Sequence, residues 1–137
     1  MIAKEKIKLI KPLQKRLGKN LLSVILFGSH AQGKAHKYSD FDLLAITKVS
    51  PKNWRKKDQL LAQICAQAEY PLDLILLTPK ELHCATLNFS PLLLSIFEHK
   101  YEVIYGDDLI KHEKEELNHK FELRKVSQFG WKIEQAA

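Results

Sequence analysis

The sequence predicts a single mixed α/β (α+β) domain in which a small β-sheet is flanked by helices. Three apolar runs have the length of buried strands, over residues 21–27, 41–47 and 72–77. Stretches with helical periodicity alternate with these runs, and Ser-Pro or Thr-Pro pairs mark three helix starts. Strands that alternate with helices are typical of α/β and α+β domains.

The length and composition indicate one globular domain over residues 1–137. The chain is 45% hydrophobic and 28% charged, which is the balance of a folded protein rather than a disordered one. It contains no apolar run near the roughly 20 residues that cross a bilayer, so no membrane association is expected. Two cysteines are too few for a disulfide framework. We therefore expect a cytoplasmic protein.

The first 20 residues predict a basic N-terminal helix over residues 3–17, ended by Gly18. This segment holds seven Lys/Arg and one Glu, whereas the rest of the chain holds 15 residues of each sign. Pro12 lacks the N–H for one internal hydrogen bond, so two short helices in place of one are an alternative. The basic row could bind RNA or an acidic partner. A solvated helix face is favoured, because no aromatic residues are interleaved for base stacking.

The next elements are a strand over 21–27, a short helix over 30–33 capped by Ser29, and a strand over 41–47. Ser50-Pro51 then predicts a helix that runs to about residue 68, with Trp54 on its packing face. The basic residues around Trp54 could contact nucleic acid. A tryptophan that packs inward argues against this, so nucleic acid is a possible but not favoured partner.

The remaining elements are a strand over 72–77, a helix over 79–87 and a helix from Ser90-Pro91 to about His99. Thr78 and Glu81 form the capping box of the first of these helices. A short strand follows over 101–105. Residues 107–137 are charged with a sparse apolar row, which predicts a C-terminal helical segment.

Asp40 and Asp42 begin the second strand and predict a metal site. Residues i and i+2 of a strand project from the same face, so both carboxylates point the same way. Such a pair is costly unless a cation lies between its members. Oxygen ligands without Cys or His nearby favour magnesium.

Asp73 is the third acidic candidate, within an otherwise apolar strand. A carboxylate in that setting is expected to be nearly desolvated and therefore paired or bound to metal. If its strand lies beside the strand of Asp40 and Asp42, the three acids can hold two metal ions for displacement at phosphorus. The alternative is an ion pair between Asp73 and a Lys or Arg of a neighbouring helix.

Gly28 and Ser29 predict a phosphate site next to these acids. Glycine allows a close approach of the backbone to a ligand, and a helix that starts at Ser29 would point free N–H groups at it. The Ser29 hydroxyl could donate to the terminal phosphates of a triphosphate. Lys34 and Lys37, in the following loop, would add positive charge.

The pattern of Gly28-Ser29, ten residues, then Asp40-x-Asp42 and a later acid at Asp73 resembles the minimal nucleotidyltransferases of the DNA polymerase β-type superfamily. The resemblance implies the nucleotidyltransferase fold and the transfer of AMP from ATP to an acceptor hydroxyl with two Mg²⁺ ions. Asp40 and Asp42 would hold both ions, and Asp73 the catalytic one. Many minimal members are antitoxins that silence a HEPN-domain ribonuclease toxin by adding AMP to a tyrosine. Members often have Arg after the Gly-Ser pair, where this chain has His30.

The expected function is therefore magnesium-dependent adenylylation of a HEPN-domain toxin partner in a hetero-oligomer. Two alternatives stay open. The chain could neutralise its partner by binding alone, with nucleotide in an idle site. It could also act on a small molecule or an RNA end. The short chain leaves little room for a second substrate-binding domain, which favours a protein acceptor.

Overall fold

The computed structural model describes the backbone of residues 1–127 and 130–135, and the side chains of residues 1–120. Its centre is a four-stranded sheet in the order β3-β2-β1-β4. The strands are β1 (Leu21–Phe27), β2 (Phe41–Thr47), β3 (Leu72–Leu77) and β4 (Glu102–Gly106). The first three match the predicted strands residue for residue, because each is an unbroken apolar run of strand length.

The sheet is mixed, as predicted. Strand β1 pairs antiparallel with both β2 and β4, whereas β2 and β3 run parallel. The parallel connection contains helix α3 (Trp54–Gln67), which satisfies the need for a long crossover between parallel strands. Strand β3 is therefore an edge strand beside β2, which carries Asp42 and begins directly after Asp40.

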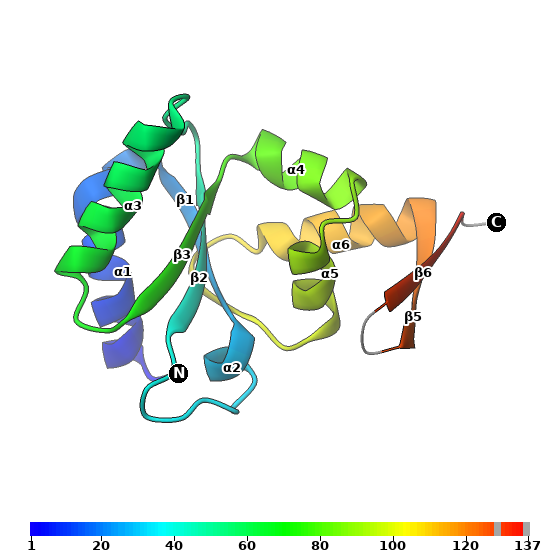
Figure 1. Ribbon diagram of the computed structural model, residues 1–137, viewed down its shortest axis with the longest axis horizontal. Coiled ribbons are helices and arrows are strands. Elements are labelled where there is room, and N and C mark those ends of the chain that lie inside the picture. Colours follow the sequence, from blue (N-terminus) through cyan, green and yellow to red (C-terminus); the bar gives the residue numbers. More distant parts are fainter. Residues whose placement is uncertain (128–129, 136–137) are drawn as a thin grey trace.

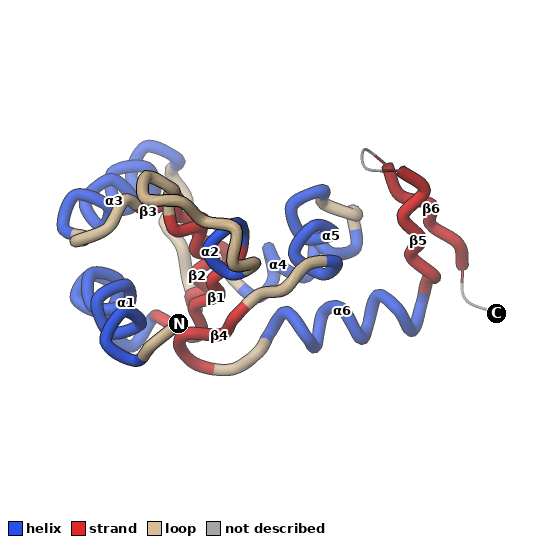
Figure 2. Tube along the Cα trace, turned by 90° about the horizontal axis from the view of Figure 1, so that it is seen from below, coloured by secondary structure: helices blue, strands red, loops and turns tan. Residues whose placement is uncertain are grey.

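Helices cover both faces of the sheet (Figure 1). Helices α1 (Ala3–Leu17) and α3 lie on one face, and the core between them and the sheet includes Leu13, Leu43 and Ile64. Helices α4 (Pro79–Leu87), α5 (Pro91–Glu98) and α6 (Leu109–Lys120) lie on the other, around Ile25 and Leu44. Figure 2 shows the two helix layers on either side of the strands. Leu43 and Leu44 face opposite clusters because neighbouring strand residues point to opposite faces.

The N-terminal helix is continuous through Pro12 and ends at Gly18, as predicted, with a glycine φ of 51°. A 3-10 turn (Gly18–Asn20) leads from it into β1. The capping box of α4 is confirmed: Glu81 N donates to Thr78 Oγ1 at 3.2 Å and Thr78 N to Glu81 Oε1 at 3.0 Å.

The start of α3 differs from the prediction. The helix begins at Trp54 rather than at Ser50-Pro51, and Asn53 is its N-cap, accepting from Arg55 N at 2.8 Å. Asn53 is as good a cap as Ser50. The chain just before Ser50 is held by Asn20, whose side chain donates to Val49 O and accepts from Val49 N, both at 2.9 Å. Trp54 therefore lies in the first turn and is 68% exposed, so its predicted place on the packing face is wrong.

The predicted helical segment over 107–137 is only partly helical. Helix α6 ends at Lys120, and two antiparallel strands follow, β5 (Phe121–Ser127) and β6 (Gly130–Gln135). The sequence from Trp131 to Glu134 alternates apolar and polar residues, which is a strand pattern that the sparse helical row concealed. This hairpin lies past the end of α6, away from the central sheet (Figures 1 and 2).

Polar contacts attach α6 to the other helices of its face. Lys114 Nζ donates to Phe97 O of α5 at 2.8 Å. His83 Nδ1 of α4 lies 3.1 Å from Glu113 Oε2 of α6, which is buried. Among the described residues, no helix is both long and apolar enough to cross a membrane.

Candidate functional site

The site lies where β1 ends and β2 begins. Phe27 of β1 pairs with Asp42 of β2, so the chain leaves β1 at Gly28 directly beside the Asp42 carboxylate. Gly28 has a φ of 72°, a left-handed conformation, and a Cβ at this position would overlap the Asp42 carboxylate. Glycine is thus required here for two separate reasons, backbone conformation and space.

The parallel register of β2 and β3 brings the second and third acids together. Asp42 pairs directly with Asp73 across the two strands. Burial raises the pKa of Asp42 above its ordinary value, and the Asp73 charge and a hydrogen bond with Asp73 add to the rise. Asp40 raises it further, so Asp42 interacts with both of the other acids.

The structure corrects the predicted environment of Asp73. Its side chain is exposed rather than desolvated, because β3 is an edge strand and Asp73 is the second residue of that strand. No Lys or Arg within residues 1–120 forms an ion pair with Asp73. The structure therefore does not support the alternative in which Asp73 pairs with a cation of a neighbouring helix. Its interaction with Asp42 still makes it part of the cluster.

The phosphate side of the site also differs in detail. Helix α2 (Gly28–Ala31) begins at Gly28 with Phe27 at the N-cap, so the predicted capping role of Ser29 is wrong. The Ser29 hydroxyl forms no hydrogen bond with the rest of residues 1–120 and is free to donate to a ligand. Lys34 and Lys37 are exposed on the following loop, and Lys37 Nζ lies 5.6 Å from the centroid of the Tyr38 ring. The structure does not bring either lysine into contact with the three acids.

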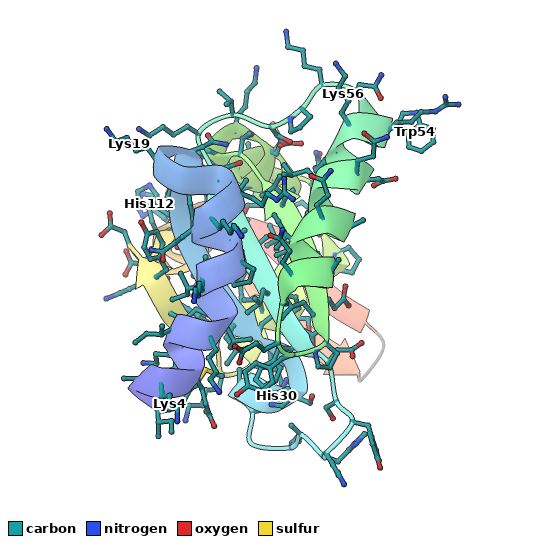
Figure 3. The ribbon with its side chains drawn as sticks, turned by 90° about the vertical axis from the view of Figure 1, so that its left-hand side faces the viewer. Lys4, Lys19, His30, Trp54, Lys56 and His112 are labelled. Atoms are coloured by element: carbon teal, nitrogen blue, oxygen red, sulfur yellow. The ribbon has the colours of Figure 1, made fainter. Side chains whose placement is uncertain are left out.

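His30 is a site residue that the sequence singled out only for replacing an arginine. Its ring stacks on Phe41 with centroids 3.6 Å apart, and its Nε2 lies 3.0 Å from Ser39 O. Figure 3 shows His30 at this end of the sheet. His30 also acts electrostatically on Asp42, where it opposes the rise in pKa. The signal available in the sequence was an aromatic residue, Phe41, between the two aspartates.

Asp42 and Asp73 lie close enough to share a divalent cation, but within residues 1–120 the oxygens of Asp40, Asp42 and Asp73 do not all lie within 4.8 Å of one another. Oxygen donors without soft ligands suit magnesium, and a cation would relieve the repulsion that raises the pKa of Asp42. Gly28 leaves Asp42 accessible to such an ion and to a phosphate bound by it.

A family model described as a nucleotidyltransferase domain matches residues 6–134. The chain belongs to this nucleotidyltransferase family. The match confirms the resemblance and the fold class predicted from the Gly-Ser and Asp-x-Asp pattern. Members of this family use a nucleoside triphosphate and a divalent metal ion.

Individual relatives of the nucleotidyltransferase agree with this assignment. A candidate protein adenylyltransferase of Methanocaldococcus jannaschii is 36% identical over 99 residues, which are 69% of this chain and 65% of that protein. The chain thus spans slightly less than two thirds of that relative's length. A solved toxin–antitoxin complex with AMP-PNP contains a chain of similar fold, with a TM-score of 0.53 and 20% identity over 83% of this chain and 87% of that one.

A second solved structure also has a similar fold. Spectinomycin adenyltransferase from Enterococcus faecialis, with ATP and spectinomycin, matches with a TM-score of 0.57 and 19% identity, over 79% of this chain and 58% of that one. The nucleotidyltransferase therefore shares its fold both with a toxin–antitoxin component and with an antibiotic-modifying enzyme.

Proposed function

We propose that this nucleotidyltransferase transfers AMP from ATP to a tyrosine hydroxyl of a HEPN-domain toxin and thereby acts as its antitoxin. The observation that carries the proposal is the register at the centre of the sheet. Asp42 pairs with Asp73 on one side and with Phe27 on the other, which joins the Gly-Ser turn to the acidic cluster. The adenylyl specificity and the protein acceptor are supported by the 36% identical relative.

The proposed roles follow from this arrangement. Asp40 and Asp42 would hold both Mg²⁺ ions, and Asp73 would be a further ligand of the catalytic one of the two. Gly28 and Ser29 would seat the triphosphate with help from Lys34 and Lys37. When bound, magnesium neutralises charge on the triphosphate and favours ionisation of the acceptor hydroxyl. Most of the rate enhancement comes from positioning and charge neutralisation.

In the transfer step, the acceptor oxygen attacks the α-phosphorus of ATP. The bond between that phosphorus and the bridging oxygen breaks, and pyrophosphate leaves with its electron pair. The hydroxyl proton passes to Asp73, which is exposed and therefore reachable by an acceptor carried on another protein. The product is an AMP–tyrosine phosphodiester.

The test uses the full chain, magnesium, ATP labelled in the α-phosphate and the toxin encoded beside it. We expect label on the toxin, its loss when tyrosines of the toxin are replaced by phenylalanine, and its absence with Asp42→Asn. No label on a toxin that binds the chain would overturn the proposed acceptor. Spectinomycin and an RNA 3′ end, included as separate acceptors, would become labelled instead if either alternative held.

Neutralisation by binding alone is separated from catalysis by the same variants. Asp42→Asn and Asp73→Asn leave the exposed surface of the domain almost unchanged in shape. If both variants still silenced the toxin in cells, the chain would act by binding. We expect both to lose silencing while they retain toxin binding in a pull-down.

A further inference from the structure

The end of the molecule opposite the acidic cluster carries a hollow lined with cations. The cluster lies where Phe27 meets Asp42, whereas the hollow lies where Leu21 meets Thr47, at the other end of the same strand pair. Six residue steps along a strand separate the two ends by about 20 Å. Figure 3 shows Lys19, Lys56 and Trp54 at this end and His30 at the other.

The hollow has a volume of about 710 Å³, within the range of small-ligand sites. It lies between the end of α1, the β2–α3 loop and the side of α3. Its lining includes Arg16, Lys19 and Lys48, and none of its lining residues is acidic. Within residues 1–120 none of these three cations forms an ion pair, so their charge is available to a ligand.

The floor of the hollow is preorganised. Asn20 holds Val49 through two hydrogen bonds of 2.9 Å, and Thr47 Oγ1 donates to Val49 O at 3.0 Å. Beside them the Ser50 hydroxyl is buried without a hydrogen-bond partner. Ser50 is one of the residues that line the hollow, although its hydroxyl oxygen is itself shielded from solvent.

Trp54 adds an aromatic surface at the same end. It is 68% exposed, and the Arg55 guanidinium carbon lies 5.4 Å from its ring centroid. Four further cations surround it in the sequence: Lys52, Arg55, Lys56 and Lys57. An inward-facing Trp54 would argue against contact between this segment and nucleic acid, but the Trp54 side chain is exposed.

We infer that this cationic hollow and Trp54 form a binding site for single-stranded nucleic acid. Trp54 does not line the hollow, but both lie at the same end of the domain (Figure 3). A single strand whose phosphates follow the cations of the hollow and those around Trp54 would bring a base to the exposed ring. An acidic peptide would use the cations but not the ring, and a duplex keeps its bases stacked away from it. The site is separate from the nucleotidyl-transfer site and does not depend on the proposed acceptor.

The test measures the binding of the full-length protein to a labelled oligouridine of about 12 nucleotides by fluorescence anisotropy at several salt concentrations. Trp54→Ala is expected to weaken binding about 5- to 100-fold, on the scale of one lost base stack, and Trp54→Phe to restore most of it. Lys19→Gln combined with Lys48→Gln is expected to reduce the slope of log K against log salt by about 1.4, or 0.7 for each lost phosphate contact.

The matched control removes the same charge elsewhere. Lys4→Gln with Lys100→Gln replaces two exposed lysines outside the hollow and should leave the affinity within about twofold. The inference is overturned if oligouridine does not bind at low salt, or if the control variant weakens binding as much as the Lys19 and Lys48 pair. It is equally overturned if an oligoglutamate peptide, a duplex of equal length or phosphatidylserine vesicles bind as tightly as oligouridine and lose as much affinity with Trp54→Ala.

Discussion

Because Gly28 has no Cβ, it can adopt a left-handed backbone conformation and leaves room for the Asp42 carboxylate. Gly28→Ala should lower the free energy of unfolding by about 1–2 kcal/mol, because φ is 72°. It should also displace the Asp42 carboxylate and lower the transfer rate. Urea unfolding and the labelled-ATP assay measure the two effects separately.

Gly33→Ala is the control for this substitution. Gly33 has a φ of 71°, but nothing lies within 4 Å of a Cβ built there. Its alanine variant should lose similar stability while activity stays near wild type. Equal losses of activity in both variants would show that strain in the turn, and not the space beside Asp42, limits transfer.

Asp42 is the acid on which the other two act. Asp42→Asn removes a charge that burial and two neighbouring carboxylates disfavour, so the metal-free protein should become more stable. Transfer should fall at least 100-fold, the scale of losing a preorganised electrostatic group. A rise in melting temperature without loss of activity would remove Asp42 from the site; thermal unfolding in EDTA and the transfer assay provide the measurements.

The positions of the site residues were largely predictable from the sequence, and their environments were not. Strand periodicity alone predicts one face for Asp40 and Asp42, but β2 begins at Phe41, so only Asp42 is a strand residue in the structure. The contact between Asp42 and Asp73 required the strand order, which a sequence without homologues does not contain. The same order places Asp73 at an edge, which is why its predicted burial was wrong.

Among the elements, α1 is joined to β4 by an ion pair that makes stability depend on pH. Lys6 Nζ lies 2.9 Å from Glu102 Oε1, and the hydrogen bond with Lys6 holds the pKa of Glu102 below its usual value. A lowered folded-state pKa means that the unfolded chain binds the proton more readily. Ionised Glu102 therefore contributes fully to the stability of the fold above its unfolded-state pKa of about 4.5. This contribution disappears as the pH falls through the lower pKa that Glu102 has in the folded state.

Glu102→Gln should remove this part of the acid sensitivity. Wild type should be more stable than the variant near pH 7, by at most about 1 kcal/mol for a half-exposed pair, and the difference should shrink below pH 4.5. Urea unfolding of both proteins between pH 3 and 7 measures it. A difference that stays constant with pH would show that the glutamate contributes packing rather than charge.

Elements with strong local signals were predictable, and those with competing signals were not. The capping box of α4 and the apolar runs of β1, β2 and β3 each specify one local structure. Both Ser50 and Asn53 are good caps, and tertiary hydrogen bonds from Asn20 decided between them. Residues 121–135 carry too few apolar residues for helix and strand periods to be told apart from the sequence.

In the whole molecule, the sheet separates two apolar clusters, and the acidic site lies at one end of the strands that both clusters hold. Magnesium with a non-hydrolysable ATP analogue should therefore stabilise the entire domain, by about 2.7 kcal/mol at 100 times the dissociation constant. Thermal unfolding measures this shift. We expect none with the analogue in EDTA and little with Asp42→Asn, and a full shift in either case would place the nucleotide away from the acids.

The two cysteines lie on opposite faces of the sheet, and this arrangement has a practical consequence. Cys65, on α3, is half-buried, and burial together with the nearby Asp73 charge raises the pKa of its thiol, which keeps it protonated and slow to react. Cys84, on α4, is exposed. A maleimide dye added at neutral pH should accordingly attach at Cys84 first. The natural chain thus carries one preferred attachment point for fluorescence measurements, on a helix of the face to which Asp42 and Asp73 also point.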